Sequence, residues 1–528
     1  MRPALPLLLC GALLLAVPGC KQDPSTPEHW ERALNRAGGA SARVRLVEQL
    51  RESGHADPAF LATLHRWLKE ERHDRVRTAM VRLIAEIGDP SSLEPLNAAI
   101  RADDPNADGK LLNRQIAKAV GTLGDPAGVP IALRLLSTRD PYVRIAAIEA
   151  LAALRVPSSA IALEDLAENL DVDPFLSHKA VEALGEIGAS SSLPVLIRMM
   201  FHERAGAHFY PVSAFALYRY GPGATEALLP LFRGEDVELT AWARQAGIAE
   251  AGVYARTAQL LGDLQAQEAE PLLLDRLTYE SSNAELQQIV RTVSAQALGR
   301  MGSRSAAPAI AAQLSSAEPH VQEQLILALI RIGGTDALPA LRQTATSRSW
   351  SVREQSARAL ALLGGTGELP VLEAMLASEE KHTRTACAAS PELPGCPDPA
   401  ALAQERRAIL MRHRATLAAG SEVQDVAGWR ARLSAPEPGL RERAAVELGS
   451  ARNVDAVAAL LPLTADPDLE VRHAALHALD LLTEVPEARR TAREALPSWR
   501  RQLDEELGQA RLGPMLEDLR RLIVKVER

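Results

Sequence analysis

The chain has 528 residues, of which 47% are hydrophobic and only 3% aromatic, and its formal net charge is −8. With 59 basic and 67 acidic residues it has no chain-wide positive charge, which argues against nucleic acid as the main partner. A core so poor in aromatic residues must be built from Ala, Leu, Val and Ile, as in closely packed helices. Because the composition is uniform after about residue 30, we expect one extended repeat array rather than several separate domains.

The first twenty residues are organised like an export signal. Arg2 supplies a positive charge, residues 4–17 are apolar, and small residues precede the expected cleavage point. This apolar run has 14 residues, fewer than the roughly 20 that a membrane-spanning helix needs. We therefore predict a signal peptide over residues 1–20.

The end of this segment, Val-Pro-Gly-Cys at residues 17–20, resembles the lipobox of bacterial lipoproteins. Gly19 and Cys20 fit that pattern, whereas Pro18 departs from it. The resemblance implies a lipid (palmitate) on Cys20, a tether over residues 21–32 and an envelope protein that faces the periplasm. Lys21 is not the Asp that retains enterobacterial lipoproteins at the inner membrane, which slightly favours the outer membrane. The alternative is a soluble periplasmic or secreted protein.

Two cysteines remain in the mature chain, and their spacing agrees with export. Cys387 and Cys396 have eight residues between them, including prolines and a glycine that allow a tight turn. The alternative is a two-cysteine metal site, but no further Cys or His lies nearby in the sequence to complete it. We expect a disulfide, which an oxidising compartment maintains.

One phrase recurs along the chain, and it describes a helical hairpin. A cap with Asp or Pro precedes Val-Arg, Ala and Leu follow at helical spacing, a glycine ends the helix, and a second helix carries Leu-Pro-x-Leu. Residues 73–96 (HDRVRTAMVRLIAEIGDPSSLEPL) are one copy, and residues 173–196 are another. The first helices are predicted to end, mostly 31 to 37 residues apart, near Gly88, Gly124, Arg155, Gly188, Gly221, Gln265, Gly302, Gly333, Gly364, Arg452 and Thr483.

This phrase resembles the HEAT-repeat family, in particular the short bacterial type related to phycobilisome lyases, over residues 40–378 and 421–490. The resemblance implies an all-α fold: a right-handed α-solenoid of about 11–12 helical hairpins. We divide it into an array at 33–378, a Cys loop with a charged helix at 379–420, and C-terminal repeats with capping helices at 421–528. The segment 379–420 is either a tolerated insertion, which we favour, or an extra contact surface.

Arginines recur at one position of the repeat, which suggests a structural ladder. In HEAT-like stacks, Asp and Arg beside the turn between the helices typically bond to neighbouring repeats. We therefore expect these arginines to connect repeats instead of forming a basic binding stripe. They are Arg77, Arg144, Arg353, Arg441 and Arg472.

Residues 201–254 depart from the repeat and hold half of the 18 aromatic residues of the chain. The predicted helix ends Gly221 and Gln265 are 44 positions apart, the irregular spacing that marks binding sites in solenoids. Aromatic side chains dominate interface hot spots, so we predict a partner-binding groove beside the loop at 202–211. Its contact residues would be Phe209, Tyr210, Tyr218, Tyr220 and Trp242. The alternative is that these large side chains fill a wider gap between irregular repeats.

Motifs for catalysis or metal binding are missing from the sequence. His202, Glu203 and His208 do not have the HExxH spacing. His473 and His477 are four residues apart and could chelate a metal, but without an evident third ligand we expect them to face solvent. No GxSxG, Walker or dinucleotide motif occurs. We therefore expect no catalytic residues, no metal, no cofactor and no enzymatic activity.

Together these patterns predict a membrane-anchored scaffold or adaptor that binds a protein or peptide partner in the bacterial cell envelope. One alternative is an envelope assembly or structural factor that binds lipid or cell-wall glycan. A second alternative is a lyase-like or metal-dependent enzyme whose site has no recognised motif.

Overall fold

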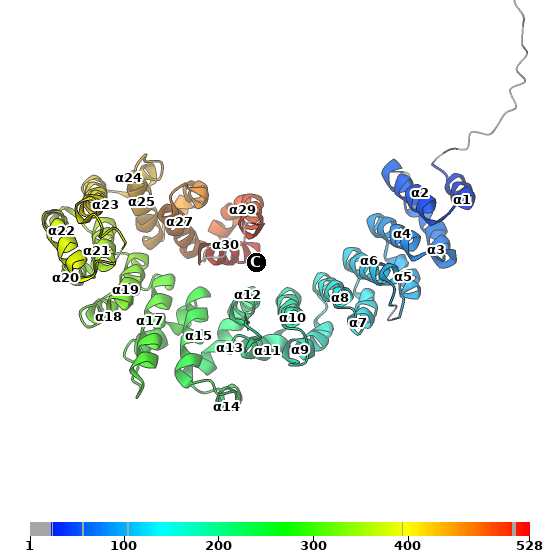
Figure 1. Cartoon of the computed structure of the whole chain (residues 1–528), viewed down its shortest axis with the longest axis horizontal. Coiled ribbons are helices and arrows are strands. Elements are labelled where there is room, and N and C mark those ends of the chain that lie inside the picture. The colour runs from blue at the N-terminus through cyan, green and yellow to red at the C-terminus, as the bar shows by residue number, and fades with distance from the viewer. Residues whose placement is uncertain (1–22, 24, 55–56, 103–104, 393, 509–513) are drawn as a thin grey trace, which may run out of the picture. The chain divides into compact units, whose positions relative to one another are not determined.

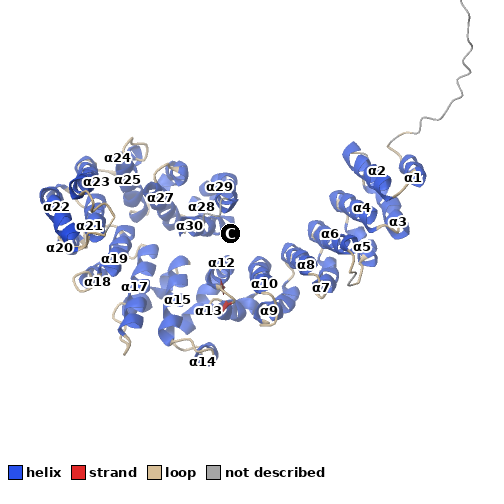
Figure 2. Ribbon diagram, viewed as in Figure 1, coloured by secondary structure: helices blue, strands red, loops and turns tan. Residues whose placement is uncertain are grey.

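The fold comes from a computed structural model in which helices account for nearly all regular structure (Figures 1 and 2). Within the described residues, the one sheet is a hairpin of β1 (Glu203–Arg204) and β2 (Ala207–His208). The predicted all-α solenoid is therefore confirmed. The predicted signal peptide and Cys20 lie outside the described residues, which are 23, 25–54, 57–102, 105–392, 394–508 and 514–528.

Two compact units divide the chain, where the sequence analysis expected one continuous array from residue 33. The first unit ends at Ser159 and the second begins at Ala160. The helices of the first unit are α1 (Pro27–Arg36), α2 (Ala40–Ser53), α3 (Leu61–Glu70), α4 (Asp74–Ile87), α5 (Leu93–Ala99), α6 (Ala107–Leu123), α7 (Val129–Leu136) and α8 (Pro141–Leu154). Helix α1 occupies part of the predicted tether at 21–32 and buries Trp30, so the tether is shorter than predicted.

The second unit contains the remaining helices. Its repeats before the cysteines are formed by α9 (Ala160–Glu168), α10 (Pro174–Ile187), α11 (Leu193–Met199), α12 (Tyr210–Tyr220), α13 (Pro222–Arg233), α14 (Val237–Gln245), α15 (Glu250–Asp263), α16 (Glu270–Arg276), α17 (Ala284–Met301), α18 (Ala307–Gln313), α19 (Pro319–Ile332), α20 (Leu338–Thr344), α21 (Trp350–Leu363) and α22 (Leu369–Ala389). The later helices are α23 (Pro399–Gly420), α24 (Val426–Arg432), α25 (Pro438–Ser450), α26 (Val457–Leu460), α27 (Leu469–Leu482), α28 (Pro486–Ala492), α29 (Leu496–Gly508) and α30 (Pro514–Glu527).

The helices begin and end where local chemistry places their caps. The Asp140 carboxylate accepts hydrogen bonds from the backbone N–H groups of Tyr142 and Val143, both at 3.1 Å, at the start of α8. Gly88 has a φ of 78°, the left-handed conformation that ends α4. Each predicted helix end lies within two residues of an observed one.

Close approach between successive first helices depends on glycines of the Ala-Leu-Gly phrase. A Cβ added at Gly262, in α15, would lie 2.5 Å from the Ala297 Cα of α17, so no larger residue fits there. Gly299 meets Ala328 of α19 in the same way, and a Cβ there would lie 2.9 Å from the Cα. The glycine therefore sets the spacing between repeats.

The predicted arginine ladder is present at several repeats. Arg353 forms a buried ion pair with Glu379 at 2.7 Å, and Arg441 pairs with Asp466 at 2.8 Å. Arg77 donates to the Leu68 carbonyl oxygen at 3.2 Å. These guanidinium groups are committed to contacts between helices, as expected.

The segment around the cysteines is a packed helical hairpin. Cys387, near the end of α22, forms the predicted disulfide with Cys396, and α23 packs back along α22. Arg406 of α23 lies over the Trp350 ring at 4.9 Å, and Arg414 pairs with Glu373 at 2.9 Å. The charged helix predicted at 400–418 is therefore α23, and it continues the stack.

The last repeats of the second unit fold back onto its earlier ones. Helix α30 packs against α12 as well as α27, and α25 packs against α19 and α21. Figure 1 shows α25, α27 and α30 beside the row formed by α12, α15, α17, α19 and α21. The predicted role of the last helices as a polar-faced cap is therefore wrong for α30, because one of its faces contacts α27 and another contacts α12.

Candidate protein-binding site

Helix α14 is the insertion that widens the repeat between Gly221 and Gln265. It follows α13 through a short turn, and the Asp236 carboxylate caps it by accepting from the Leu239 backbone N–H at 2.9 Å. Because α13 and α15 already form the hairpin of this repeat, α14 is an additional element beside α11. The irregular spacing seen in the sequence thus has a structural cause.

A groove of about 510 Å³ lies between α14 and the second helices α9 and α11. We call it the α14 groove, and its principal lining residues are Glu168, Leu170, Arg198, Asp236, Glu238 and Trp242. The Trp242 ring is partly buried, with ring centroids 6.2 Å from Phe201 and 5.6 Å from His202. Leu170 is 68% exposed, which is unusual for a large aliphatic side chain. The groove therefore combines an aromatic anchor with accessible apolar surface.

Three of the five aromatic residues predicted to contact a partner are buried. Phe209, Tyr210 and Tyr218 pack inside the second unit and have no open surface to offer. The Tyr220 hydroxyl lies 3.0 Å from the carbonyl oxygens of Leu184 and Ala189 and is engaged in packing α12 onto α10. Partner contact by these four residues conflicts with their burial and bonding, because large side chains fill the irregular repeat. Only Trp242 faces a groove.

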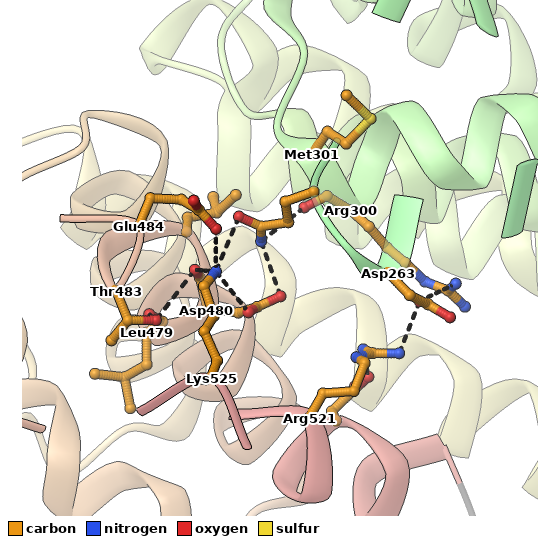
Figure 3. A network of polar contacts seen from close by, with 12 residues as sticks. Asp263, Arg300, Met301, Leu479, Asp480, Thr483, Glu484, Arg521 and Lys525 are labelled. Atoms are coloured by element: carbon orange, nitrogen blue, oxygen red, sulfur yellow. Dashed lines mark hydrogen bonds and ion pairs between the residues drawn. The ribbon is translucent and has the colours of Figure 1, made fainter. Parts of the chain in front are cut away.

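Tyr218 connects the irregular repeat to a charged cluster that the sequence analysis did not predict. Its hydroxyl donates to the Asp263 carboxylate at 2.6 Å, and both burial and that carboxylate raise the pKa of the tyrosine well above its usual value. The same carboxylate accepts from Arg521 of α30 at 2.7 Å and from Arg300 of α17. Figure 3 shows the two guanidinium groups converging on Asp263.

Lys525 forms the second centre of this cluster, which we call the C-terminal closure. Its ammonium group lies 3.1 Å from the Asp480 carboxylate, 3.2 Å from the Gln265 side-chain oxygen and in an ion pair with Glu484 (Figure 3). The Gln265 amide donates to Asp480 at 2.8 Å. The closure is defined by Asp263, Gln265, Arg300, Asp480, Arg521 and Lys525.

Ionisable groups beside the closure are tuned by burial and by each other. Burial, and after it the positive charge of Arg331, lowers the pKa of His477 to about 4. The His477 ring donates to the Arg331 carbonyl oxygen at 3.1 Å. Although burial opposes ionisation of Asp518, Arg521 lowers the pKa of this carboxyl well below its usual range. The junction therefore holds His477 neutral and Asp518 charged at neutral pH.

His473 and His477 do not face solvent as predicted. Both are partly buried between α27 and the earlier repeats, since the C-terminal repeats fold back over them. Among the residues that the structure describes, no group of three or more His, Cys, Asp or Glu side chains is arranged to hold a metal ion. Nor does any described helix have the length and apolarity to cross a membrane.

A second cavity, of about 640 Å³, lies between α21, α23 and α25. Arg358 pairs with Glu442 at 2.6 Å and with Glu470 along one wall, and His413 lies 3.1 Å from Glu354 on another. Apolar residues such as Ile409 and Leu362 complete it. We call this space the α23 cavity, and its size suits a small molecule.

A signal for the closure was present in the sequence but went unused. Most predicted helix ends are glycines, yet Gln265 and Arg452 hold the left-handed conformation with φ values of 52° and 53°. Both use their side chains across the junction, since Arg452 donates to the carbonyl oxygens of Met301 and Leu481 at 2.8 Å. A non-glycine residue at a glycine position therefore marked a side chain with a separate task.

Comparison with known proteins defines the class. A family described as HEAT repeats matches residues 106–175, 307–390 and 426–506. These segments carry the hairpins described above, so the chain is a HEAT-repeat protein.

Two relatives and two solved structures are similar to parts of it. Both relatives are named phycocyanobilin lyase subunit alpha. The one from Nostoc sp. is 28% identical over 201 residues, 35% of this chain and 71% of that protein. The one from Picosynechococcus sp. is 26% identical over 228 residues, 40% and 82% respectively. The karyopherin Kap121p bound to the SUMO protease Ulp1p matches 94% of this chain and 69% of its own, with a TM-score of 0.47 and 13% identity. The CpcE–CpcF complex of phycocyanin lyase from Nostoc sp. matches 63% and 97%, with a TM-score of 0.23 and 21% identity.

The relatives correct the expectation that this chain has no enzymatic role. Both carry the name of a lyase subunit, and each alignment covers more than two thirds of the relative. The motif search looked for nucleotide, hydrolase and zinc sites, and none of these motifs is diagnostic for a lyase subunit built from helical repeats.

Proposed function

We propose that this chain binds a protein partner and that the α14 groove is the contact site. The observation that carries this proposal is Trp242, a partly buried indole in a 510 Å³ groove next to the exposed Leu170. Aromatic side chains in a pocket with an apolar rim are the usual anchors of protein interfaces. The HEAT-repeat stack supports the proposal because such stacks offer extended surfaces to their partners.

Crosslinking in cells tests this role. A photoreactive residue at Leu170 is expected to trap a partner, and Trp242→Ala is expected to reduce the yield of that same crosslinked species by about tenfold. Tyr142→Ala serves as the matched control, because Tyr142 is 61% exposed but lies on α8 of the first unit. Equal yields from the Trp242 and Tyr142 variants would remove the groove from the interface. Circular dichroism of both variants checks that the helices remain folded.

We further infer that Cys20 carries a lipid and holds the chain at the membrane of the cell envelope, with the outer membrane slightly favoured. The apolar segment at 4–17 and the Gly-Cys pair at its end support this. The disulfide between Cys387 and Cys396 agrees with an oxidising compartment.

Fractionation tests the anchor. Cys20→Ser is expected to move the protein from the membrane to the soluble fraction and to abolish labelling by palmitate. Cys387→Ser is the control that leaves both unchanged. A Cys20→Ser protein that still sediments with membranes rules out the lipid anchor.

A second candidate function is that of a lyase subunit, favoured by the two relatives with that name. The α23 cavity offers room for a small molecule between α21 and α25. Mixing the purified chain with phycocyanobilin and recording its absorption spectrum tests this directly. Ala415→Trp narrows the cavity from the exposed side of α23 and is expected to reduce any spectral change. An unaltered spectrum with the unmodified chain eliminates this candidate.

A further inference from the structure

The two walls of the α14 groove differ in chemistry from the regular repeat surface. One wall carries Glu168 and Leu170 at and after the end of α9, and the other carries Asp236, Glu238 and Trp242 of α14 and its cap. The Leu170 side chain is mostly exposed, and the Trp242 ring is supported from behind by Phe201. The site is therefore a cleft with an acidic margin and an aromatic base.

Acidic side chains outnumber basic ones in this groove. Arg198 pairs with Glu168 at 2.6 Å, so these two charges offset each other. The Asp236 carboxylate is occupied in part by the Leu239 backbone N–H but keeps its negative charge. Glu238 is exposed and makes no hydrogen bond or ion pair with any residue that the structure describes. Two carboxylates are thus left without a counter-ion on the α14 side.

Neutral His202 does not compensate this charge. Burial beside Trp242 lowers the pKa of the imidazole below its ordinary value, with Glu168 opposing the shift. At neutral pH the groove therefore contains one cation, Arg198, against three carboxylates.

An indole next to unpaired carboxylates is suited to one kind of side chain. A lysine or arginine can place its aliphatic stem on the ring and its charge within reach of the carboxylates, which combines a cation–π contact with an ion pair. We propose that the α14 groove binds a basic segment of a protein partner, with a cationic side chain over Trp242 and beside Glu238, and an aliphatic one against Leu170. This rests on the proposed protein-binding function and specifies the chemistry of the partner.

Peptide binding to the full chain tests the charge preference. The probes are a fluorescein-labelled peptide of alternating lysine and leucine and its glutamate–leucine counterpart, followed by fluorescence anisotropy. We expect the lysine peptide to bind more tightly and its affinity to fall with added salt. Glu238→Lys and Trp242→Ala are each expected to weaken it by about tenfold. Glu285→Lys, at an exposed position of α17, makes the same charge change away from the groove and is expected to have a much smaller effect.

The outcomes separate this inference from the proposed function. Equal weakening by Glu238→Lys and Glu285→Lys would show attraction to the net charge of the chain and overturn a basic-segment site in the groove. So would tighter binding of the glutamate peptide. If the lysine peptide fails while Trp242→Ala still removes the crosslinked partner, the groove binds a partner of different chemistry and the proposed function stands. If the peptide result holds but the crosslink is unchanged by Trp242→Ala, the proposed function fails at this site instead.

Discussion

Two neighbouring residues at the end of α15 represent two different ways in which this protein holds its helices together. Gly262 allows α17 to approach within contact of its backbone, and this contact is apolar and repeats along the stack. Asp263 points to the other side, where it accepts from Tyr218, Arg300 and Arg521. The stack uses small residues at a fixed period, whereas the closure depends on single ionic residues far apart in the chain. The first kind of contact is therefore redundant and the second is not.

Removing the centre of the closure is expected to have the largest effect. Asp263→Ala leaves Arg300 and Arg521 without their shared carboxylate, and an uncompensated buried charge costs about 3–5 kcal/mol. Hydrogen exchange should show lost protection in α30 and α12, while α4 and α6 of the first unit remain unchanged. Equal exchange of α30 in the variant and the parent would mean that the closure is held by packing alone.

Acid is expected to weaken the same junction through His477. The pKa of His477 is about 4 in the folded chain and about 6.5 when unfolded, so between these values the unfolded chain binds more protons. Stability is then lost as the pH falls from about 6.5 towards 4, by at most about 3 kcal/mol. Urea unfolding at several pH values measures this slope. His477→Gln should flatten it, whereas His320→Gln, at an exposed position, should not.

A single methyl group in the regular stack is expected to cost somewhat less. Gly262→Ala places a Cβ 2.5 Å from the Ala297 Cα, and such overpacking costs about 1–3 kcal/mol. Gly223→Ala in α13 is the matched control, since nothing lies within 4 Å of the added methyl group and Ala favours helix. Denaturant midpoints of the two variants should move in opposite directions. A stable Gly262→Ala protein would show that the repeats can slide apart without loss.

The smallest effect is expected from an exposed ion pair of α30. Glu527 bonds to Arg500 at 2.7 Å, but the Arg500 side chain is 59% exposed. Solvent screens such pairs, so Glu527→Gln should change the free energy of unfolding by less than about 1 kcal/mol. A loss comparable to that of Asp263→Ala, in the same exchange experiment, would mean that burial is not what distinguishes the closure.

Much of the local structure could be predicted because it is periodic or covalent. The helix ends at Gly88, Gly124 and Gly188 follow from a repeated phrase, and so does the ladder that includes Arg353. The disulfide at Cys387 follows from spacing and the intervening turn residues. In each case nearby residues determine the outcome, so the sequence contains the whole argument.

The closure and the groove could not be predicted in this way. Asp263 and Arg521 are 258 positions apart, and no local pattern indicates that they meet. The aromatic composition of residues 201–254 predicted a groove, but it could not separate Trp242, which lines one, from Phe209, which is buried. Burial depends on which repeats meet, and that depends on the accumulated rotation between successive hairpins.

The closure also constrains how this gene can change in length. An open stack tolerates duplication of a hairpin, because each added unit only shifts the end of the chain. Between Gln265 and Asp480 the number of hairpins is fixed, since one more or one fewer would carry Asp480 away from the residues to which it bonds. Insertion of a whole repeat there is then more damaging than most point substitutions, and this segment must evolve by exchanging residues while its repeat count stays constant.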